Sequence, residues 1–360
     1  MFRLTTFPAQ DGDCLLLSYG KDADDAHHVL VDGGRTGTYL ALRPTLAEIG
    51  KRGGRLELLV LSHIDADHIE GLLKLASDPA LPLHINRVWF NGFDQMSRLR
   101  AMGPAQGDRF SDAIRQTRWL WNSEFQGDAT CLSADGAPLP VTLDGDLMLT
   151  LLSPDLAKLR VMRDAWKDWR DIKAGERAEA ERVKATPGGL QIMGRRPMPS
   201  PLDVEALANA DEQSDDEPPN GSSIAFVAEW KGKRILFAAD AHSDLLIKGL
   251  RQLIGKEPDR YRLDLFKVSH HGSVRNTSRA LIELLQCRAF LLSTNGSRHG
   301  HPDPETIARF LKYGQSGPKA LYFNYRQPYT APWNQQALKD AYDYTCCFPS
   351  GAAGHLVIDL

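Results

Sequence analysis

The segment LSHIDADHIEG (61–71) concentrates side chains that bind metal ions. Within six positions it holds His63, Asp65, Asp67 and His68. It directly follows the apolar run 58–61, which is typical of a buried strand. Carboxylates this close repel each other unless a cation lies between them, and charged groups are seldom buried without partners. The segment therefore predicts a metal site, and the alternative is an acidic turn exposed to solvent.

More polar side chains follow other strand-like runs of the sequence, such as RILFAAD and LFKVSHHGS. The residues concerned are Asp32, Asp240, His270, His271, His299 and His301. Loops at strand ends are where a rigid scaffold places catalytic groups. Histidines gathered in several short stretches of this kind indicate a site more strongly than one stretch alone. We therefore expect these residues to lie near the 61–71 motif.

The spacing of these residues suggests how two ions would be held. In an extended segment His63 and Asp65 point to the same side and could share one ion. Asp67 and His68 lie just beyond, at a helix start, and could hold a second ion. Asp240 could bridge the two, and one histidine of the HH pair could complete the second site. Such ligands suit zinc, iron or manganese, and two neighbouring ions bind an anionic group and deliver a hydroxide at neutral pH.

The rest of the sequence has strand and helix patterns in both halves. Strand patterns occupy 2–9, 14–20, 27–34, 85–92, 141–143 and 147–154, and later 222–230, 233–240, 265–273, 289–294, 320–324 and 355–360. Helical spacing occupies 39–53, a segment that begins at or near His68, 278–286 and 304–314. Strands in both halves, each half with its own helices, predict an α/β fold of two sheets packed face to face.

The character of the sequence changes after Pro154. From Asp155 to about Ala185 it is rich in charge, with apolar residues three and four apart, which predicts an amphipathic helix. The stretch that follows is rich in Pro, Gly and acidic residues and predicts a loop. We interpret about 155–219 as an insertion that covers the site or contacts a protein partner or a second copy of the chain. The alternative is that the insertion is exposed to solvent and has no role in the site or in binding. Its tryptophans are expected to pack the helix rather than to stack on bases.

Composition and charge narrow the class of protein. The chain has 360 residues, 42% hydrophobic and 25% charged, and we expect one domain over 1–360 that includes the insertion. The net charge of −3 creates no basic field for nucleic acid or anionic membrane, so an anionic substrate must be bound by local charge. Five scattered cysteines indicate reduced thiols. With neither a signal peptide nor a membrane-spanning stretch in the sequence, we expect a cytoplasmic protein.

The order of these motifs resembles that of the metallo-β-lactamase superfamily, and most closely its ComEC/Rec2-like branch. DGDCLLL, LSHIDADHIEGL, NGSSIAF, ILFAAD, KVSHHGS and HGHPDPE each resemble motifs of that branch, in the same order, from about residue 6 to 310 without the insertion. The resemblance implies an αββα sandwich, one or two divalent ions at the sheet edges, and a hydrolase. For ComEC-like domains it implies a nuclease or phosphodiesterase.

The resemblance also implies a role for each matching residue. The implied ligands are His63 and Asp65 for the first ion, Asp67 and His68 for the second, Asp240 as the bridge, and one of His270 and His271 for the second ion. We favour His271 as that ligand, which leaves His270 to touch the substrate. Asp67 would also orient the attacking hydroxide. Asp32 would orient a histidine ligand through its free ring N–H.

Two positions depart from the usual pattern of the superfamily. Asp65 stands where a histidine is common, and the usual third histidine of the first site is missing between His68 and Asp240. Asn220 or Ser222 would have to fill that position. A site richer in oxygen favours Mn²⁺ or Mg²⁺ over Zn²⁺, and the first ion would bind more weakly.

The remaining polar residues near these motifs have two interpretations each. Ser273, with Arg275 and Asn276, would bind phosphate oxygens or cap the next helix. His301 would donate a proton or hydrogen bond to the substrate, with His299 as its substitute, or would only form part of a helix entrance. The spacing of these residues does not decide between a role in binding substrate and a structural role.

Three functions fit these predictions. The first is a metal-dependent hydrolase of phosphodiesters, including nucleic acid. The second is hydrolysis of a lactone, thioester or β-lactam, as in other branches of the superfamily. The third is a metal-bound but non-catalytic binding protein that uses the insertion as its contact surface. The complete set of second-ion ligands favours an enzyme, and we expect zinc or manganese, with magnesium as a further candidate.

Overall fold

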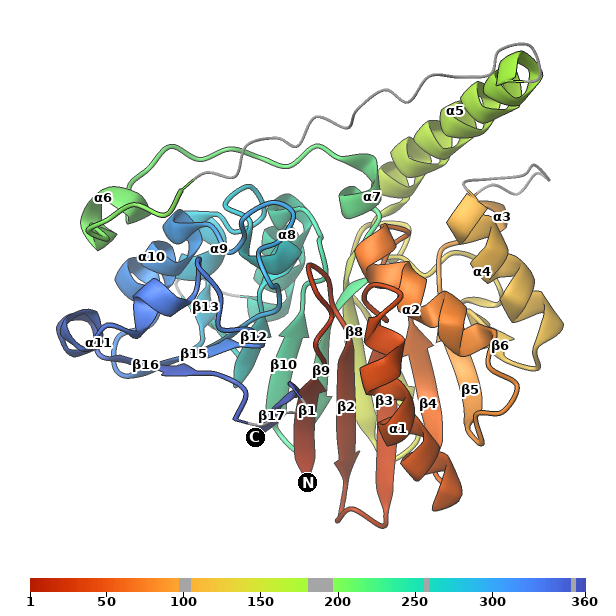
Figure 1. Ribbon diagram of the computed structural model, residues 1–360, viewed down its shortest axis with the longest axis horizontal. Coiled ribbons are helices and arrows are strands. Elements are labelled where there is room, and N and C mark those ends of the chain that lie inside the picture. The colour runs from red at the N-terminus through yellow and green to blue at the C-terminus, as the bar shows by residue number, and fades with distance from the viewer. Residues whose placement is uncertain (97–104, 181–196, 256–258, 351–353) are drawn as a thin grey trace.

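Two mixed β-sheets form the centre of the protein (Figure 1). The computed structural model describes residues 1–96, 105–180, 197–255, 259–350 and 354–360. The first sheet contains, in order, β17 (Leu356–Asp359), β1 (Phe2–Thr6), β2 (Leu15–Gly20), β3 (Ala26–Val31), β4 (Arg55–Val60), β5 (His84–Trp89) and β6 (Leu120–Trp121). Pairing is antiparallel from β17 to β3 and parallel from β3 to β6.

The second sheet has the same mixed character. It contains, in order, β16 (Tyr344–Cys347), β15 (Lys319–Phe323), β14 (Ala289–Leu292), β12 (Leu265–Lys267), β10 (Lys233–Phe237), β9 (Ala225–Trp230), β8 (Leu147–Ser153) and β7 (Leu139–Leu143). Pairing is parallel from β16 to β10 and antiparallel from β10 to β7. Because parallel strands run in one direction, their carboxyl ends lie at one edge of each sheet.

The two sheets pack face to face, with helices on their outer faces. On β2, Leu15 and Leu17 pack between the sheets and Leu16 faces the helices, as side-chain alternation along a strand requires. The first sheet is covered by α1 (Thr38–Lys51), α2 (Ala66–Ala76), α3 (Phe93–Met96), α4 (Ala105–Gln116) and the start of α5 (Leu156–Ala180). The second is covered by α6 (Val204–Ala208), α8 (Ser243–Ile254), α9 (Arg279–Glu283), α10 (Pro304–Tyr313) and α11 (Gln336–Tyr342). The predicted αββα sandwich is confirmed.

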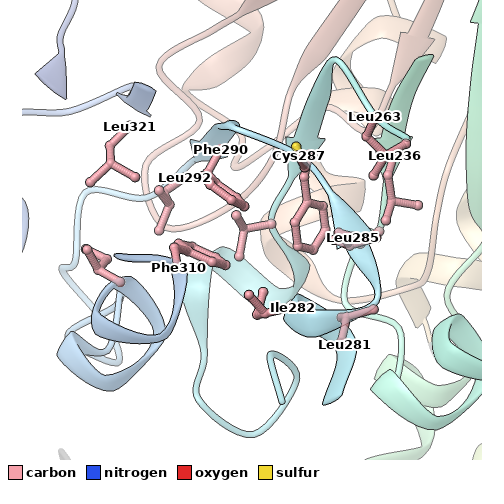
Figure 2. Close-up of a cluster of buried hydrophobic side chains, with 14 of the residues drawn as sticks. Leu236, Leu263, Leu281, Ile282, Leu285, Cys287, Phe290, Leu292, Phe310 and Leu321 are labelled. Atoms are coloured by element: carbon pink, nitrogen blue, oxygen red, sulfur yellow. The ribbon is translucent and has the colours of Figure 1, made fainter. Parts of the chain in front are cut away.

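Figure 2 shows the apolar layer beneath the helices of the second sheet. Phe290 of β14 stacks on Phe310 of α10, with ring centroids 4.2 Å apart. Leu236 of β10 and Leu281 of α9 are fully buried in the same cluster. Burial of apolar surface contributes about 25 cal/mol per Å². The layer therefore fixes the strands whose ends carry polar side chains.

Several elements differ from those that the sequence predicts. The predicted strand patterns do not include β6, β11 (Tyr261–Arg262), β13 (Leu285–Gln286) or β16, each of which is only two to four residues long. The predicted helix 278–286 is too long, since α9 ends at Glu283 and β13 pairs with β11. The predicted loop of the insertion is wrong at α6, which is capped by the Asp203 side chain and buries Val204.

The insertion lies between β8 and β9, which are neighbours in the second sheet. α5 begins in the core, where Trp166 is fully buried and packs edge-on against Phe93, so the packing role predicted for this tryptophan is confirmed. α5 then projects away from the body of the protein (Figure 1), and the predicted end of its helix near Ala185 falls in 181–196, outside the described residues. α7 (Pro218–Gly221) leads the chain back to β9. No described helix, α5 included, is long and apolar enough to cross a bilayer.

Candidate metal centre

The predicted site residues meet where the carboxyl ends of β3, β4, β10 and β12 reach one edge of the sandwich. Asp240 follows β10, and its Oδ2 atom is the point on which the histidines converge. The Nε2 atoms around it belong to His68 at 3.5 Å, His63 and His271 at 3.7 Å, and His270 at 3.8 Å. Asp67 Oδ2 lies 3.4 Å from His271 Nε2. Side chains far apart in the sequence thus surround one small volume.

The backbone at the HH pair is in the left-handed conformation. φ is 45° at His270 and 54° at His271, and 91° at Gly272. Non-glycine residues rarely hold positive φ, and such strain persists where the surrounding structure enforces it, often at functional sites. A side chain at Gly272 would collide with Pro302, because its Cβ would lie 2.6 Å from the Pro302 Cβ. This turn therefore needs glycine, and it directs both imidazoles toward Asp240.

Hydrogen bonds determine which nitrogen of each ring is available. Asp32 Oδ2 accepts hydrogen bonds from His68 Nδ1 at 2.8 Å and from Ser62 Oγ at 2.7 Å. Because the Ser62 hydroxyl donates to Asp32, it accepts from His63 Nδ1 at 3.0 Å. In both rings Nδ1 therefore carries a proton, and Nε2 is the atom left to bind a second proton or a cation. Asp32 makes the contact to a histidine that the resemblance implies.

The ring of His271 is held in the same way. Its Nδ1 donates to the carbonyl of Ser293 at 2.9 Å. The Nε2 atoms of His63, His68 and His271 and the Oδ1 atom of Asp240 are buried and have no hydrogen-bond partner among the described residues. A buried polar atom without a partner costs about 1–3 kcal/mol. These atoms are therefore suited to hold a cation.

Three overlapping groups of described side chains have ligand atoms within 4.8 Å of one another. The groups are Asp67 with His68 and His271, His63 with His68 and Asp240, and Asp13 with Asp32 and His68. Asp65 lies 3.7 Å from His63 Nε2, but its side chain is 43% exposed. The implied second-ion ligands Asp67, His68 and His271 thus lie in one group, whereas the implied first-ion ligand Asp65 belongs to none. Imidazole nitrogens and carboxylate oxygens at these spacings fit divalent ions such as Zn²⁺ or Mn²⁺.

The carboxylates and imidazoles shift each other's pKa. Burial alone would lower the pKa of His271, but Asp240 and Asp13 outweigh it and raise that pKa to about 10. Burial alone would raise the pKa of Asp240, but His271 and His68 outweigh it and hold it well below its usual range. Without a cation, His271 therefore keeps a proton that a divalent ion would displace.

Three buried charged residues near the site escaped the sequence prediction. Asp13 and Lys267 form an ion pair at 2.7 Å, with side chains 1% and 0% exposed. Asp13 Oδ1 also lies 3.6 Å from His271 Nδ1. The third residue, Asp215, comes from the insertion and lies 3.5 Å from His270 Nδ1. Asp13 and Lys267 could have been found from the sequence, because each is a charged residue inside a strand-like run, DGDCLLL or LFKVSHHGS. Asp215 could not, because it is one of several acidic residues in its segment.

The two candidates for the missing first-site ligand lie in or next to α7. Asn220 is buried, its Nδ2 donates to Asp215 at 2.7 Å, and its Oδ1 has no hydrogen-bond partner among the described residues. The Ser222 hydroxyl donates to the carbonyl of Pro219 at 2.7 Å. Of the two, Asn220 is the residue with a buried, unused oxygen.

The polar residues after the HH pair have contacts of their own. Ser273 is buried, and its hydroxyl accepts from the backbone N–H of Arg275 at 3.3 Å. It does not cap the next helix, because Ser278 caps α9, and that interpretation is wrong. The guanidinium of Arg275 pairs with Asp216 at 2.7 Å, so binding phosphate would require this pair to open.

The loop HGHPDPE places two more histidines next to the HH pair. His301 lies beside His270, with ring centroids 5.5 Å apart, and its Nδ1 is 3.5 Å from Asp303 Oδ1. His299 is exposed and stacks on His301 with centroids 5.8 Å apart. The loop therefore lines the approach to the HH pair.

The fold and these residues define a metallo-β-lactamase-type sandwich with side chains able to hold metal ions. The sequence model described as "Metallo-beta-lactamase superfamily" matches residues 12–102, which include the HxDxDH motif. No curated protein sequence matches the chain. Among solved structures, a variant of CmlA beta-hydroxylase is similar at 10% identity and a TM-score of 0.37, over 100% of this chain and 54% of that one. This chain thus spans about half the length of that protein, and a similarity of this size says nothing of activity.

Proposed function

We propose that the protein is a metal-dependent hydrolase that cleaves a phosphodiester, in nucleic acid or in a smaller anionic substrate. The observation that carries this proposal is the convergence of four imidazole Nε2 atoms within 3.8 Å of Asp240 Oδ2. The superfamily match over residues 12–102 supports hydrolysis. The ordered motifs that resemble the ComEC-like branch support a phosphodiester as the bond that is cleaved.

Each side chain has a proposed part in this reaction. Divalent ions at the site would supply Lewis acidity and lower the pKa of a water molecule. The proposed ligands are His63, Asp65, Asp67, His68, Asp240 and His271. Asp67 would also accept a hydrogen bond from the attacking water and so orient it. His301 would donate a proton to the leaving oxygen.

We further propose that the chain forms one domain with 155–219 as an insertion. The direct pairing of β8 with β9 across the insertion supports this interpretation. The pairing of β17 with β1 supports it as well, because it joins the two ends of the chain in one sheet.

Metal titration followed by a substrate panel tests the proposed function. In calorimetry the apoprotein should bind one Mn²⁺ or Zn²⁺ tightly and a second more weakly, because only the second-ion set is complete. The Mn²⁺-loaded protein should cleave bis-p-nitrophenyl phosphate, DNA or RNA, and leave a lactone, a thioester and a β-lactam intact. A protein that binds no ion would refute the proposal, and turnover confined to the second group would reassign the substrate class.

A further inference from the structure

The end of the insertion enters the metal centre. Between α6 and α7 the chain crosses over the second half of the protein, and α7 then leads into β9 (Figure 1). The backbone N–H of Ile224 donates to the carbonyl of Ser62 at 3.0 Å, which places this segment beside the residue that precedes His63. Asp215 belongs to the same segment, and its side chain is 0% exposed.

The Asp215 carboxylate accepts several hydrogen bonds. Its Oδ2 accepts from Asn220 Nδ2 at 2.7 Å and from Asn276 Nδ2 at 2.8 Å, and lies 3.5 Å from His270 Nδ1. Its Oδ1 accepts from the backbone N–H of Glu217 at 3.1 Å. The side chain is thus a fixed acceptor of hydrogen bonds.

Asp215 determines how the Asn276 amide is oriented and, through it, where His270 carries its proton. A carboxylate only accepts hydrogen bonds, so Asn276 must turn its NH₂ group toward Asp215. The Oδ1 atom of Asn276 then faces His270 Nδ1 at 2.9 Å and accepts its proton. Nε2 is the remaining ring nitrogen, 3.8 Å from Asp240 Oδ2. In this orientation the neutral ring offers a lone pair toward an ion held by Asp240.

The same carboxylate orients Asn220. Because Nδ2 of Asn220 donates to Asp215, Oδ1 is the atom left free, and it is buried without a hydrogen-bond partner among the described residues. An amide oxygen suits Mn²⁺ or Mg²⁺. Asn220 and His270 also lie side by side, with Nδ2 and Nδ1 3.4 Å apart. Asp215 therefore holds two candidate ligands next to each other.

We propose that Asp215, supplied by the insertion, is a positioning residue that strengthens binding of the first ion by holding His270 and Asn220 toward it. The first-ion set is the one that needs support, because Asp65 is 43% exposed and stands where a histidine is common. This inference rests on the proposed metal-dependent function and adds a part for the insertion in metal binding. Groups that hydrogen-bond to metal ligands typically contribute about 10- to 100-fold in affinity.

Calorimetric titration of the apoprotein with Mn²⁺ tests this role without any substrate. Asp215→Asn keeps the size of the side chain and removes its charge. We expect it to weaken the weaker-bound ion about 10- to 100-fold and to leave the tighter ion unchanged. His270→Ala should weaken the same ion. Adding Asp215→Asn to His270→Ala should then have a smaller effect than Asp215→Asn has alone.

Asp216→Asn is the matched control, since it makes the same change at the next residue. The Asp216 side chain is 86% exposed and pairs with Arg275, so the control should bind both ions as the wild type does. If Asp215→Asn does not fold, as judged by thermal unfolding, Asn276→Leu removes the acceptor for His270 and must weaken the same ion.

Three results would overturn the inference. One is unchanged affinity for the weaker ion in a folded Asp215→Asn or Asn276→Leu protein, and another is an equal loss at both sites. The third is an unchanged weaker ion in His270→Ala. A wild-type protein that binds no ion at all would instead refute the proposed function.

Discussion

Replacing Asp32 with asparagine should weaken binding of the second, tighter ion, because one hydrogen bond fixes the ring of its proposed ligand His68. Asp32 Oδ2 accepts from His68 Nδ1 at 2.8 Å, and its side chain is 1% exposed. His68 lies with Asp67 and His271 in the group proposed for the second ion. The Asp32→Asn amide brings an NH₂ group to a position that now only accepts. If that group faces His68, the ring must accept at Nδ1 and carry its proton on Nε2, which removes the lone pair from the metal site.

The orientation of the new amide follows from the contacts of Ser62. Its backbone N–H donates to Asp32 Oδ1 at 2.8 Å and cannot adapt, whereas its hydroxyl can rotate. Leaving that buried N–H without an acceptor would cost about 1–3 kcal/mol, so the amide oxygen should face it and the NH₂ should face His68. Disturbing a group that orients a ligand typically weakens metal binding by about 10- to 100-fold, or about 1.4–2.8 kcal/mol. We expect this loss for the second ion and a smaller change for the first.

Calorimetry with Mn²⁺ measures both affinities, and thermal unfolding of the apoprotein checks the fold. Asp264→Asn is a suitable control, because Asp264 also accepts from a backbone N–H, that of Arg234 at 2.9 Å, and lies at the opposite ends of β10 and β12. It should leave both affinities unchanged. A folded Asp32→Asn protein that binds both ions as tightly as the wild type would refute the argument from the proton position. Loss of the weaker ion alone would mean that His68 binds the first ion instead.

Turnover and pH dependence give further tests of the same geometry. Asp67→Asn should nearly abolish turnover of bis-p-nitrophenyl phosphate, since it removes charge from a ligand and from the acceptor for water; retention of more than about a tenth of the wild-type rate would contradict this role. His301→Ala should lower kcat about 10²–10⁴-fold with metal content and Tm nearly unchanged, whereas a lost ion would make His301 a ligand. Metal uptake near neutral pH should release protons, because the pKa of His271 is raised to about 10 without a cation and the ring must be neutral to bind one. Affinity should therefore fall as the pH falls from about 8 to about 6. Titrations in buffers of different ionisation enthalpy count the released protons, and a count of zero would contradict the pKa argument.

Much of the site could be predicted because its residues follow strands that the sequence marks clearly. The run 58–61 is apolar and fully buried, as its composition indicates, and it leads directly into the HxDxDH motif. β4 and β10 each run in parallel with a neighbouring strand, and their carboxyl ends reach the same edge. A motif after one strand and Asp240 after the other therefore come together without any further information.

Asp215 could not be predicted, because its position depends on contacts between distant segments. The hydrogen bond from Asn276 to Asp215 spans 61 residues, and no periodicity or motif encodes it. The same limit applies to α6, whose five residues are too few to form a stable helix by propensity. It is stabilised by burial of Val204 and by the ion pair of Glu205 with Lys312 of α10. In both cases contacts between distant segments, and not the local sequence, determine the structure.

The histidine rings of the centre are held by groups other than a metal ion. The acceptors of their Nδ1 protons are Ser62 for His63, Asp32 for His68, Asn276 for His270 and the Ser293 carbonyl for His271. These acceptors come from both halves of the sandwich. Ordering a side chain on binding costs about 0.5–1.5 kcal/mol. Because the fold already orders these rings, ion binding does not incur this cost. A difference in affinity between the two ions should therefore come from the number and charge of their ligands.

This distinction predicts two kinds of variant. Asp32→Asn and Asp215→Asn disturb the orientation of ligands but leave every proposed ligand in the chain, so raising the Mn²⁺ concentration should restore occupancy and with it most of the turnover. Asp67→Asn keeps the rings in place but changes a ligand and the acceptor for water, so turnover should stay low when both ions are bound. Rates measured against Mn²⁺ concentration separate the two kinds. If saturating Mn²⁺ rescued Asp67→Asn as fully as Asp32→Asn, Asp67 would be only one more group that orients a ligand, and its proposed part in the reaction would be wrong.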